Sequence, residues 1–378
     1  MLRFLLLFSS LFLIQGMQPV VLKHEKKVNE FDPKLDLSMM YWVTSDLDND
    51  KSDLSWKSLH EVLVHTDETE YTLPLIKQPY YEALKYSEMA LNDAIGNIVG
   101  QIYPKKDVLK SGILGVFDKA EGDKAVEQMN EKGYVIFKNK LSQEKIDTLN
   151  EQIQKLEYRT NSVFDNTKRD GSVNFVKDQR DVLKHAPTAI DIMTDPLIMY
   201  IVQGYLECEP INTQTNTWWS VAGGVNKDQT QLWHQDFTWV KFVKIFIYLN
   251  DVKRQNGPHR YVPGSFKHIQ PVLDKFKSYK VSDRISDKEI ESMYPNIEHF
   301  DGDAGTIIIE DTRGFHSGTH PEEGYRHLLQ FEFAVSTYRY KDDSLFKLDI
   351  CESTLSKDQI VNINTYKRMF KRVNIVKC

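Results

Sequence analysis

The spacing of apolar residues predicts that helices dominate the first half of this chain. Apolar positions recur at three- and four-residue steps in 79–102, which Pro104 ends, and again in 123–131, which Gly133 ends. Ser142 is placed to cap a further helix, and residues 188–207 give one more. The apolar stripe of the helix after Ser142 contains Ile146, Leu149, Ile153 and Leu156.

After about residue 212 the pattern changes to short β-rich runs separated by Gly, Pro, Asn and Asp. Ser286 and Glu289 have the spacing of a capping box, which predicts a helical insert among the strands. Helices followed by about seven strands indicate an α+β fold whose strands close into a barrel or roll. The predicted strands are 134–139, 212–220, 231–237, 243–250, 260–265, 305–311 and 327–335.

The ends of the chain have patterns of their own. Residues 1–16 combine a basic start with a short apolar run, which is typical of a signal peptide and places the protein on the secretory route. A start at Met17 is the alternative, and it would leave the protein in the cytoplasm. We expect 17–120 to be a partly helical extension and 346–378 to be a helical tail.

Composition narrows the class of protein. The chain has 378 residues, of which 41% are hydrophobic and 27% charged, so it can form an ordinary globular core. A net charge of −6 without long basic blocks argues against nucleic-acid binding. The three cysteines, at 208, 351 and 378, contain no C-x-x-C pair, and their number allows one disulfide. Beyond the N-terminal run we expect no membrane span, and the oligomeric state is not predicted.

A histidine two residues before an acidic residue is a common metal-binding pair, but such pairs also arise by chance. The chain contains four of them, with His at 65, 234, 299 and 320. Only His234 and Asp236 fall within a predicted strand, LWHQDF, where both side chains would point to one face. The other three pairs lie in predicted loops or turns. We therefore choose His234 and Asp236 as candidate ligands.

Two later residues complete a recognisable chemistry. His316 follows the predicted strand GTIIIED, and Arg326 begins the next strand. Two imidazoles and one carboxylate on one face of a metal are the ligand set of non-haem Fe(II) oxygenases. A charged Arg326 on the inner face of a strand needs an anionic partner, which a dicarboxylate cosubstrate would supply.

Several ordered motifs carry a resemblance to a known family. They are His234-Gln235-Asp236, YLNDV at 248–252, NGP at 256–258, VPGS at 262–265, GDAGTIIIEDTRGFHSG at 302–318 and Arg326. Together with GYVIFKNKLSQEKIDTLNEQI upstream, they resemble the phytanoyl-CoA dioxygenase (PhyH) family over roughly 125–340.

The resemblance implies a double-stranded β-helix, or jelly roll, with flanking helices over 121–345. It implies an Fe(II)- and 2-oxoglutarate-dependent dioxygenase with O2 as cosubstrate, ascorbate as a candidate reductant, and His234, Asp236 and His316 as metal ligands. Arg326 would hold the distal carboxylate of 2-oxoglutarate. Because halogenating relatives lack the carboxylate ligand, Asp236 favours hydroxylation, here of a small or lipid-like molecule.

Weaker candidates surround these four residues. Lys244, Phe246 and Tyr248 alternate on one predicted strand and are candidate contacts of 2-oxoglutarate, while Trp239 is a candidate for the mouth of the substrate pocket. Two alternatives stay open at this point. One is a ligand-binding jelly roll without turnover, and the other is a metal-dependent jelly-roll enzyme that does not use 2-oxoglutarate.

Overall fold

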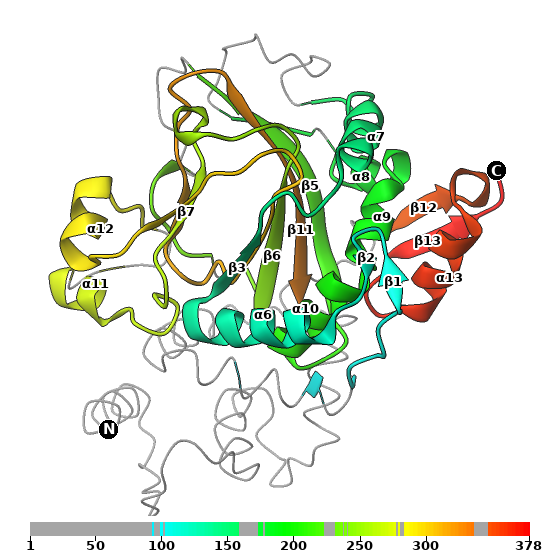
Figure 1. The fold of residues 1–378 in the computed structure, drawn as a ribbon, viewed down its shortest axis with the longest axis horizontal. Coiled ribbons are helices and arrows are strands. Elements are labelled where there is room, and N and C mark those ends of the chain that lie inside the picture. Colours follow the sequence, from blue (N-terminus) through cyan, green and yellow to red (C-terminus); the bar gives the residue numbers. More distant parts are fainter. Residues whose placement is uncertain are drawn as a thin grey trace, which may run out of the picture.

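Two antiparallel sheets face each other and form the centre of the molecule (Figure 1). The computed structural model describes residues 93, 99–100, 103–158, 173–176, 178–222, 231–236, 238–239, 241–276, 279, 283–335 and 347–378. The larger sheet has the order β3-β9-β6-β11-β5-β4 and the smaller one the order β10-β7-β8. This arrangement, with helices flanking the two sheets, is the predicted α+β jelly roll.

Every neighbouring pair within both sheets is antiparallel. The larger sheet consists of β3 (Tyr134–Phe137), β4 (Val173–Phe175), β5 (Ile211–Val221), β6 (Phe242–Tyr248), β9 (Ile307–Glu310) and β11 (Tyr325–Ala334). The smaller sheet consists of β7 (His259–Tyr261), β8 (Glu298–Phe300) and β10 (His316–Gly318). Two further short strands, β1 (Ser111–Gly112) and β2 (Gly115–Val116), pair with each other, and a 3-10 turn, η3 (Arg254–Asn256), precedes β7.

Alternation along the strands separates two cores. On β6, Val243, Ile245 and Ile247 face outward and join the main core, which the helices cover. The helices are α6 (Lys119–Lys132), α7 (Gln143–Ile153), α8 (Arg180–His185), α9 (Thr188–Met193) and α10 (Pro196–Leu206). Each fully buried aliphatic side chain here contributes about 1.5–3 kcal/mol, so this layer anchors the larger sheet.

The helix predicted over 188–207 is in fact two helices. Proline disfavours helical geometry in the residue before it, and Asp195 accordingly leaves the helical region and accepts a hydrogen bond from the backbone N–H of Leu197. The boundary predicted at Gly133 is confirmed: Gly133 ends α6 with a φ of 83°, a conformation that glycine adopts without strain.

The strand predicted over 231–237 is wrong, because 231–236 do not form a regular strand. Within these described residues, single-residue bridges join Trp233 to Ile285 and His234 to His316. Asp236 lies outside any strand and is held by a hydrogen bond from its backbone N–H to the carbonyl oxygen of Thr312, at 2.8 Å. The two candidate ligands therefore converge through separate contacts rather than through strand alternation.

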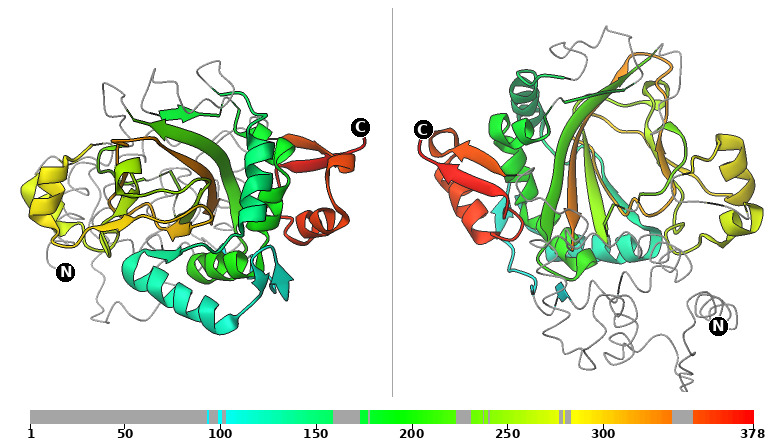
Figure 2. Two further views of the ribbon diagram at one scale, coloured as in Figure 1. Left: turned by 45° about the horizontal axis from the view of Figure 1, so that its top comes forward. Right: turned by 180° about the vertical axis from the view of Figure 1, so that it is seen from behind.

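The helical insert between β7 and β9 has a small core of its own. The predicted capping box is confirmed, with Ser286 and Glu289 bonded reciprocally at the start of α12 (Asp287–Met293). This helix and α11 (Gln270–Lys275) lie outside the smaller sheet, at the opposite end of the molecule from the C-terminus (Figure 2). Trp233 and Phe315, neighbours of two candidate ligands, are fully buried in the insert's core.

The C-terminal tail is only partly helical, which corrects the prediction for 346–378. It contains β12 (Leu348–Cys351), a 3-10 turn η5 (Glu352–Thr354), α13 (Lys357–Thr365) and β13 (Val373–Val376). The two strands pair in parallel, and a disulfide joins Cys351 to Cys378. This unit packs on α8 and α9 at the side of the molecule (Figure 2), and the backbone N–H of Asn212 on β5 donates to its Met369 carbonyl oxygen.

Several N-terminal predictions fall outside the described residues: the signal peptide at 1–16, most of the extension and most of the helix expected over 79–102. Within the part of the chain that the structure describes, no helix has the length and apolar character that crossing a bilayer requires.

The disulfide closes a 27-residue segment, so its loss should be measurable. We expect Cys351→Ser to lower the free energy of unfolding of the C-terminal unit by about 2–4 kcal/mol, because the unfolded segment regains conformational entropy. Urea unfolding followed by circular dichroism would measure this, with Cys208→Ala as the control. Rapid alkylation of both Cys351 and Cys378 in native, unreduced protein would contradict the pairing.

Candidate metal centre

The backbone brings two histidines from distant parts of the chain side by side. His234 and His316 exchange hydrogen bonds between backbone N–H and carbonyl groups, each 3.0 Å long. Their imidazole centroids lie 4.2 Å apart, and both residues are buried. This reciprocal pairing fixes the relative position of two of the three candidate ligands.

Hydrogen bonds orient both imidazole rings. Nδ1 of His234 lies 2.8 Å from the carbonyl oxygen of Leu232, and Nδ1 of His316 lies 3.0 Å from that of Gly314. A carbonyl oxygen only accepts, so each Nδ1 carries the proton and donates it. Each Nε2 is thereby left as the atom that points toward the other ring and toward Asp236, which is the orientation a metal-ligating histidine needs.

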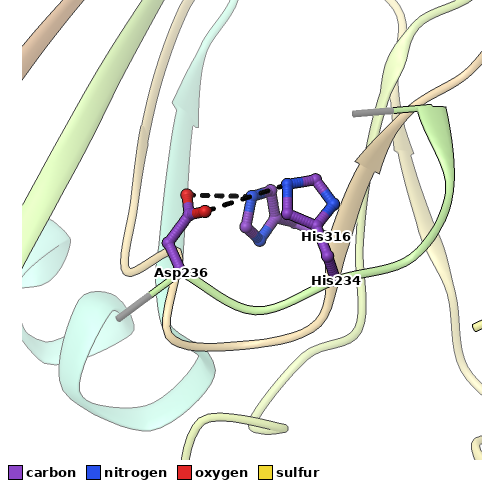
Figure 3. Close-up of side chains that lie close together, drawn as sticks. All are labelled: His234, Asp236 and His316. Carbon is purple, nitrogen blue, oxygen red and sulfur yellow. Dashed lines mark ion pairs between the residues drawn. The ribbon is translucent and has the colours of Figure 1, made fainter. Parts of the chain in front are cut away.

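Asp236 completes the cluster (Figure 3). Its Oδ1 lies 3.9 Å from Nε2 of His234, and its Oδ2 lies 3.3 Å from Nε2 of His316. One donor atom from each of the three residues lies within 4.8 Å of the others. Donor atoms at neighbouring positions on a metal, with bonds of about 2.1 Å, lie about 3 Å apart, so small side-chain rotations would fit the set to a cation.

The protonation states of His234 and Asp236 suit metal binding. Burial and the neighbouring His316 lower the pKa of His234 to about 3, which keeps His234 neutral. Burial alone would raise the pKa of Asp236, but Lys244 and His316 outweigh it and hold that pKa well below its usual range. The carboxylate is therefore ionised, as a ligand of a divalent cation must be.

The turn before His316 is held by a buried ion pair. The Arg313 guanidinium donates two hydrogen bonds to the Asp311 carboxylate, at 2.5 and 2.9 Å, and both side chains are fully buried. Tyr205, on α10, donates to the same carboxylate at 2.5 Å. This turn supplies the carbonyl groups that bind Asp236 and His316, so the ion pair positions both ligands.

Arg326 is a buried cation, and no carboxylate pairs with it among the described residues. Its guanidinium donates to the carbonyl oxygen of Gly257 and, at 3.4 Å, contacts the hydroxyl of Ser220, while its Nε has no partner. Burial lowers the pKa of Arg326 to about 10. A buried guanidinium with an unpartnered Nε fits the predicted contact with a carboxylate of a bound ligand.

Glycine lets this guanidinium approach the strand of the metal cluster. A Cβ at Gly318 would lie 2.5 Å from Nη2 of Arg326. Gly318 is two residues after His316 on β10, which places the guanidinium about 7 Å along the strand from that ligand. The buried hydroxyl of Thr319, which has no partner, belongs to the same region.

Lys244 lies on the inner face of β6, next to the metal cluster. Its Nζ is 2.6 Å from Oδ2 of Asp236, and Lys244 faces Glu332 on β11, six residues beyond Arg326. Six residues of strand span about 20 Å, so Lys244 and Arg326 do not share one carboxylate. If Arg326 holds the distal carboxylate of 2-oxoglutarate, Lys244 does not reach that carboxylate, and its predicted contact with 2-oxoglutarate stays a prediction.

The remaining candidates lie on the inner face, with differing contacts. Phe246 packs between Trp218 and His259, which leaves its predicted contact with the cosubstrate untested. The hydroxyl of Tyr248 donates to the carbonyl oxygen of Phe300 at 2.6 Å and so ties the two sheets together. Trp239 is buried rather than at an exposed mouth, and its indole N–H donates to Glu332 at 2.5 Å.

Sequence reasoning missed a second buried pair next to the cluster. His259 and Glu310 contact each other at 2.8 Å across the two sheets. Burial raises the pKa of Glu310 to about 8 and holds the pKa of His259 well below its usual range. A hydrogen-bonded pair without net charge therefore lies behind His316. Glu310 ends the otherwise apolar strand IIIE, so the sequence indicated only that this carboxyl group follows a buried strand.

Comparison with known proteins agrees with this geometry. The sequence profile of the phytanoyl-CoA dioxygenase (PhyH) family matches residues 129–323, just over half of the chain. That segment includes all three residues of the cluster. No curated protein matches the chain significantly.

Several solved structures resemble the chain at low identity. HygX from Streptomyces hygroscopicus, solved with nickel and 2-oxoglutarate, is 12% identical, with 56% of this chain and 86% of that chain covered and a TM-score of 0.38. AviO1 from Streptomyces viridochromogenes Tue57 is 16% identical, with 58% and 96% covered and a TM-score of 0.39. SnoN, a non-heme alpha ketoglutarate dependent epimerase from nogalamycin biosynthesis, is 16% identical, with 57% and 83% covered and a TM-score of 0.40.

The ion pair in the turn provides a test of how the cluster is held. We expect Asp311→Asn to destabilise the protein by about 3–5 kcal/mol, because it leaves the Arg313 guanidinium buried beside a neutral amide. Tyr205→Phe removes one hydrogen bond to the same carboxylate and should cost about 1 kcal/mol. Chemical unfolding would measure both. Equal stability of Asp311→Asn and the wild type would contradict the role given to this turn.

Proposed function

Because this chain belongs to the phytanoyl-CoA dioxygenase family and is an oxygenase-type enzyme that depends on Fe(II) and 2-oxoglutarate, we propose that it hydroxylates an aliphatic C–H bond of a small or lipid-like molecule. In this reaction the substrate, 2-oxoglutarate and O2 give the hydroxylated product, succinate and CO2. One oxygen atom of O2 enters the alcohol and the other enters succinate. Ascorbate is the candidate reductant that would keep the iron in the Fe(II) state.

One observation carries the proposal: His234, Asp236 and His316 converge with their donor atoms turned toward one another. A facial set of two imidazoles and one carboxylate leaves three coordination positions open, which suits a chelating cosubstrate and O2. Asp236 supports hydroxylation in particular, because it occupies the position that a halide would need in a halogenating enzyme.

Bound Fe(II) and 2-oxoglutarate would supply the oxidising chemistry, and the chain's own residues would arrange it. The three ligands would hold the metal, and Arg326 would bind the distal carboxylate of 2-oxoglutarate through its unpartnered Nε and its terminal nitrogens. The protein would contribute orientation and the exclusion of water rather than acid–base catalysis.

The interior has features that support both tasks. The cluster lies between two sheets, and Phe246, Ile308 and Leu328 form an apolar surface on the inner face between the cluster and Arg326. Such a surface suits the methylene groups of 2-oxoglutarate and keeps bulk water from its two charged ends.

We also propose that the protein follows the secretory route. The disulfide between Cys351 and Cys378 supports this, because disulfides persist in oxidising compartments and are rare in the cytosol. The apolar run near the N-terminus has the character of a signal peptide. Expression of a tagged full-length chain, followed by fractionation and peptide mapping, would locate the mature protein.

Removal of one ligand tests the proposed activity. The purified protein with Fe(II) and O2 should convert 2-oxoglutarate to succinate. His234→Ala should reduce the rate of this conversion at least 1,000-fold, which corresponds to a rise of about 4 kcal/mol in the activation free energy. Mass spectrometry of succinate measures the reaction. Turnover of His234→Ala at the wild-type rate would exclude the proposed metal centre.

Gly318 allows the cosubstrate end of the site to be tested separately. We expect Gly318→Ala to displace the Arg326 guanidinium and to weaken 2-oxoglutarate binding about tenfold, or 1.4 kcal/mol, with the metal affinity unchanged. Calorimetry with Ni(II)-loaded protein separates the two affinities. Arg326→Met provides the companion variant. Unchanged 2-oxoglutarate affinity in both variants would remove the role given to Arg326.

A further inference from the structure

An ammonium group contacts the carboxylate of the metal cluster. Lys244, on the inner face of β6, places its Nζ 2.6 Å from Oδ2 of Asp236 and 3.6 Å from Oε2 of Glu332. Only 13% of the Lys244 side chain is exposed. Both distances are those of ion pairs, so the ammonium group of Lys244 bridges the two carboxylates.

The two oxygens of Asp236 have different surroundings. Oδ1 faces Nε2 of His234 at 3.9 Å, whereas Oδ2 lies 3.3 Å from Nε2 of His316 and alone receives the hydrogen bond from Lys244. Because Asp236 lies outside any strand, its backbone is fixed mainly by the hydrogen bond to Thr312. The direction of its carboxylate therefore depends on side-chain contacts, of which the one with Lys244, at 2.6 Å, is shorter than the one with His316, at 3.3 Å.

Lys244 is itself held from the larger sheet. Glu332 lies directly opposite Lys244 in the pairing of β11 with β6. Oε1 of Glu332 accepts hydrogen bonds from the indole of Trp239 at 2.5 Å and from the hydroxyl of Thr213 at 2.7 Å. With Oε1 anchored, Oε2 remains for Lys244. A continuous series of contacts thus runs from β5 and β11 through Glu332 and Lys244 to Asp236.

We propose that Lys244 is a positioning residue for the metal centre, which holds the Asp236 carboxylate by Oδ2 so that Oδ1 is presented to the metal, and that Glu332 acts through Lys244. This inference rests on the proposed function. This role differs from the predicted contact of Lys244 with 2-oxoglutarate. Residues that support metal ligands in this way usually change the metal affinity by about 10- to 100-fold when they are removed.

Charge also favours this assignment. Without a bound metal ion, Lys244 offsets one of the two negative charges of Asp236 and Glu332, and the charge that remains attracts a divalent metal ion. A ligand carboxylate that binds through one oxygen occupies one coordination position and leaves three for the chelating cosubstrate and O2. Lys244 suits this position because its ammonium group is compact and donates in several directions.

The test uses the metal alone. We expect Lys244→Met, which keeps the length of the side chain and removes the charge, to weaken binding of Co(II) to the full-length protein by about 10- to 100-fold. The Co(II) absorption in the visible range reports both the affinity and the ligand geometry, and it requires no turnover.

Lys241, directly before β6, offers a matched control. It is also a buried lysine between two carboxylates, with its Nζ 3.0 Å from Asp93 and 3.6 Å from Glu207, but neither carboxylate belongs to the metal cluster. Lys241→Met should therefore cost a similar amount of stability and leave the Co(II) affinity and spectrum unchanged. Thermal unfolding of both metal-free variants separates an effect on folding from an effect on the site.

A double-mutant cycle tests the role of Glu332. Glu332→Gln alone should weaken Co(II) binding, and it should have little further effect when Lys244 is already Met, because Glu332 acts through Lys244. Wild-type Co(II) affinity and spectrum in a folded Lys244→Met protein would overturn the proposal and leave the metal centre intact. Failure of the wild type itself to bind Co(II) would overturn the proposed function instead.

Discussion

The interior of this protein is organised by the need to compensate charges that lie between two sheets. Asp236, Lys244, Glu332 and Arg326 all lie on or against the inner face, and each is largely withdrawn from water. An isolated ion in such surroundings costs several kcal/mol, so each requires a partner with good geometry. Lys244 has two carboxylate partners, whereas Arg326 has carbonyl and hydroxyl groups only. Lys244 therefore has carboxylate partners within the protein, whereas Arg326 is left to pair with the carboxylate of a bound ligand.

The same constraint explains how the cluster is held. His234 and Asp236 do not share a regular strand, so strand geometry does not align them. Backbone hydrogen bonds to the turn before His316 align them instead, and the buried pair of Asp311 and Arg313 keeps that turn in place. The helices outside the larger sheet take part as well, because Tyr205 on α10 binds the same carboxylate. The site thus depends on contacts from three layers of the molecule.

The local pattern of the sequence predicted much of the fold, and its failures have physical causes. The strand predicted around Arg326 correctly placed this residue on the inner face of β11, and the glycine at 133 correctly ended α6. The helix over 188–207 was wrong because Pro196 favours a break, and the C-terminal strands were missed because their pairing is parallel and non-local. The convergence of His234, Asp236 and His316 was inferred from spacing and motif. The contact of Lys244 with Asp236 could not be inferred, because nothing in one strand specifies what faces it across the roll.

Anaerobic absorption spectroscopy tests the central claim most directly. Fe(II) is added to the metal-free protein, followed by 2-oxoglutarate, and the visible charge-transfer band of the chelated cosubstrate is recorded. A centre formed by His234, Asp236 and His316 predicts a band that saturates at one equivalent of each component and disappears in His234→Ala. Tight binding of Fe(II) without any band on addition of 2-oxoglutarate, or an undiminished band in His234→Ala, would contradict it.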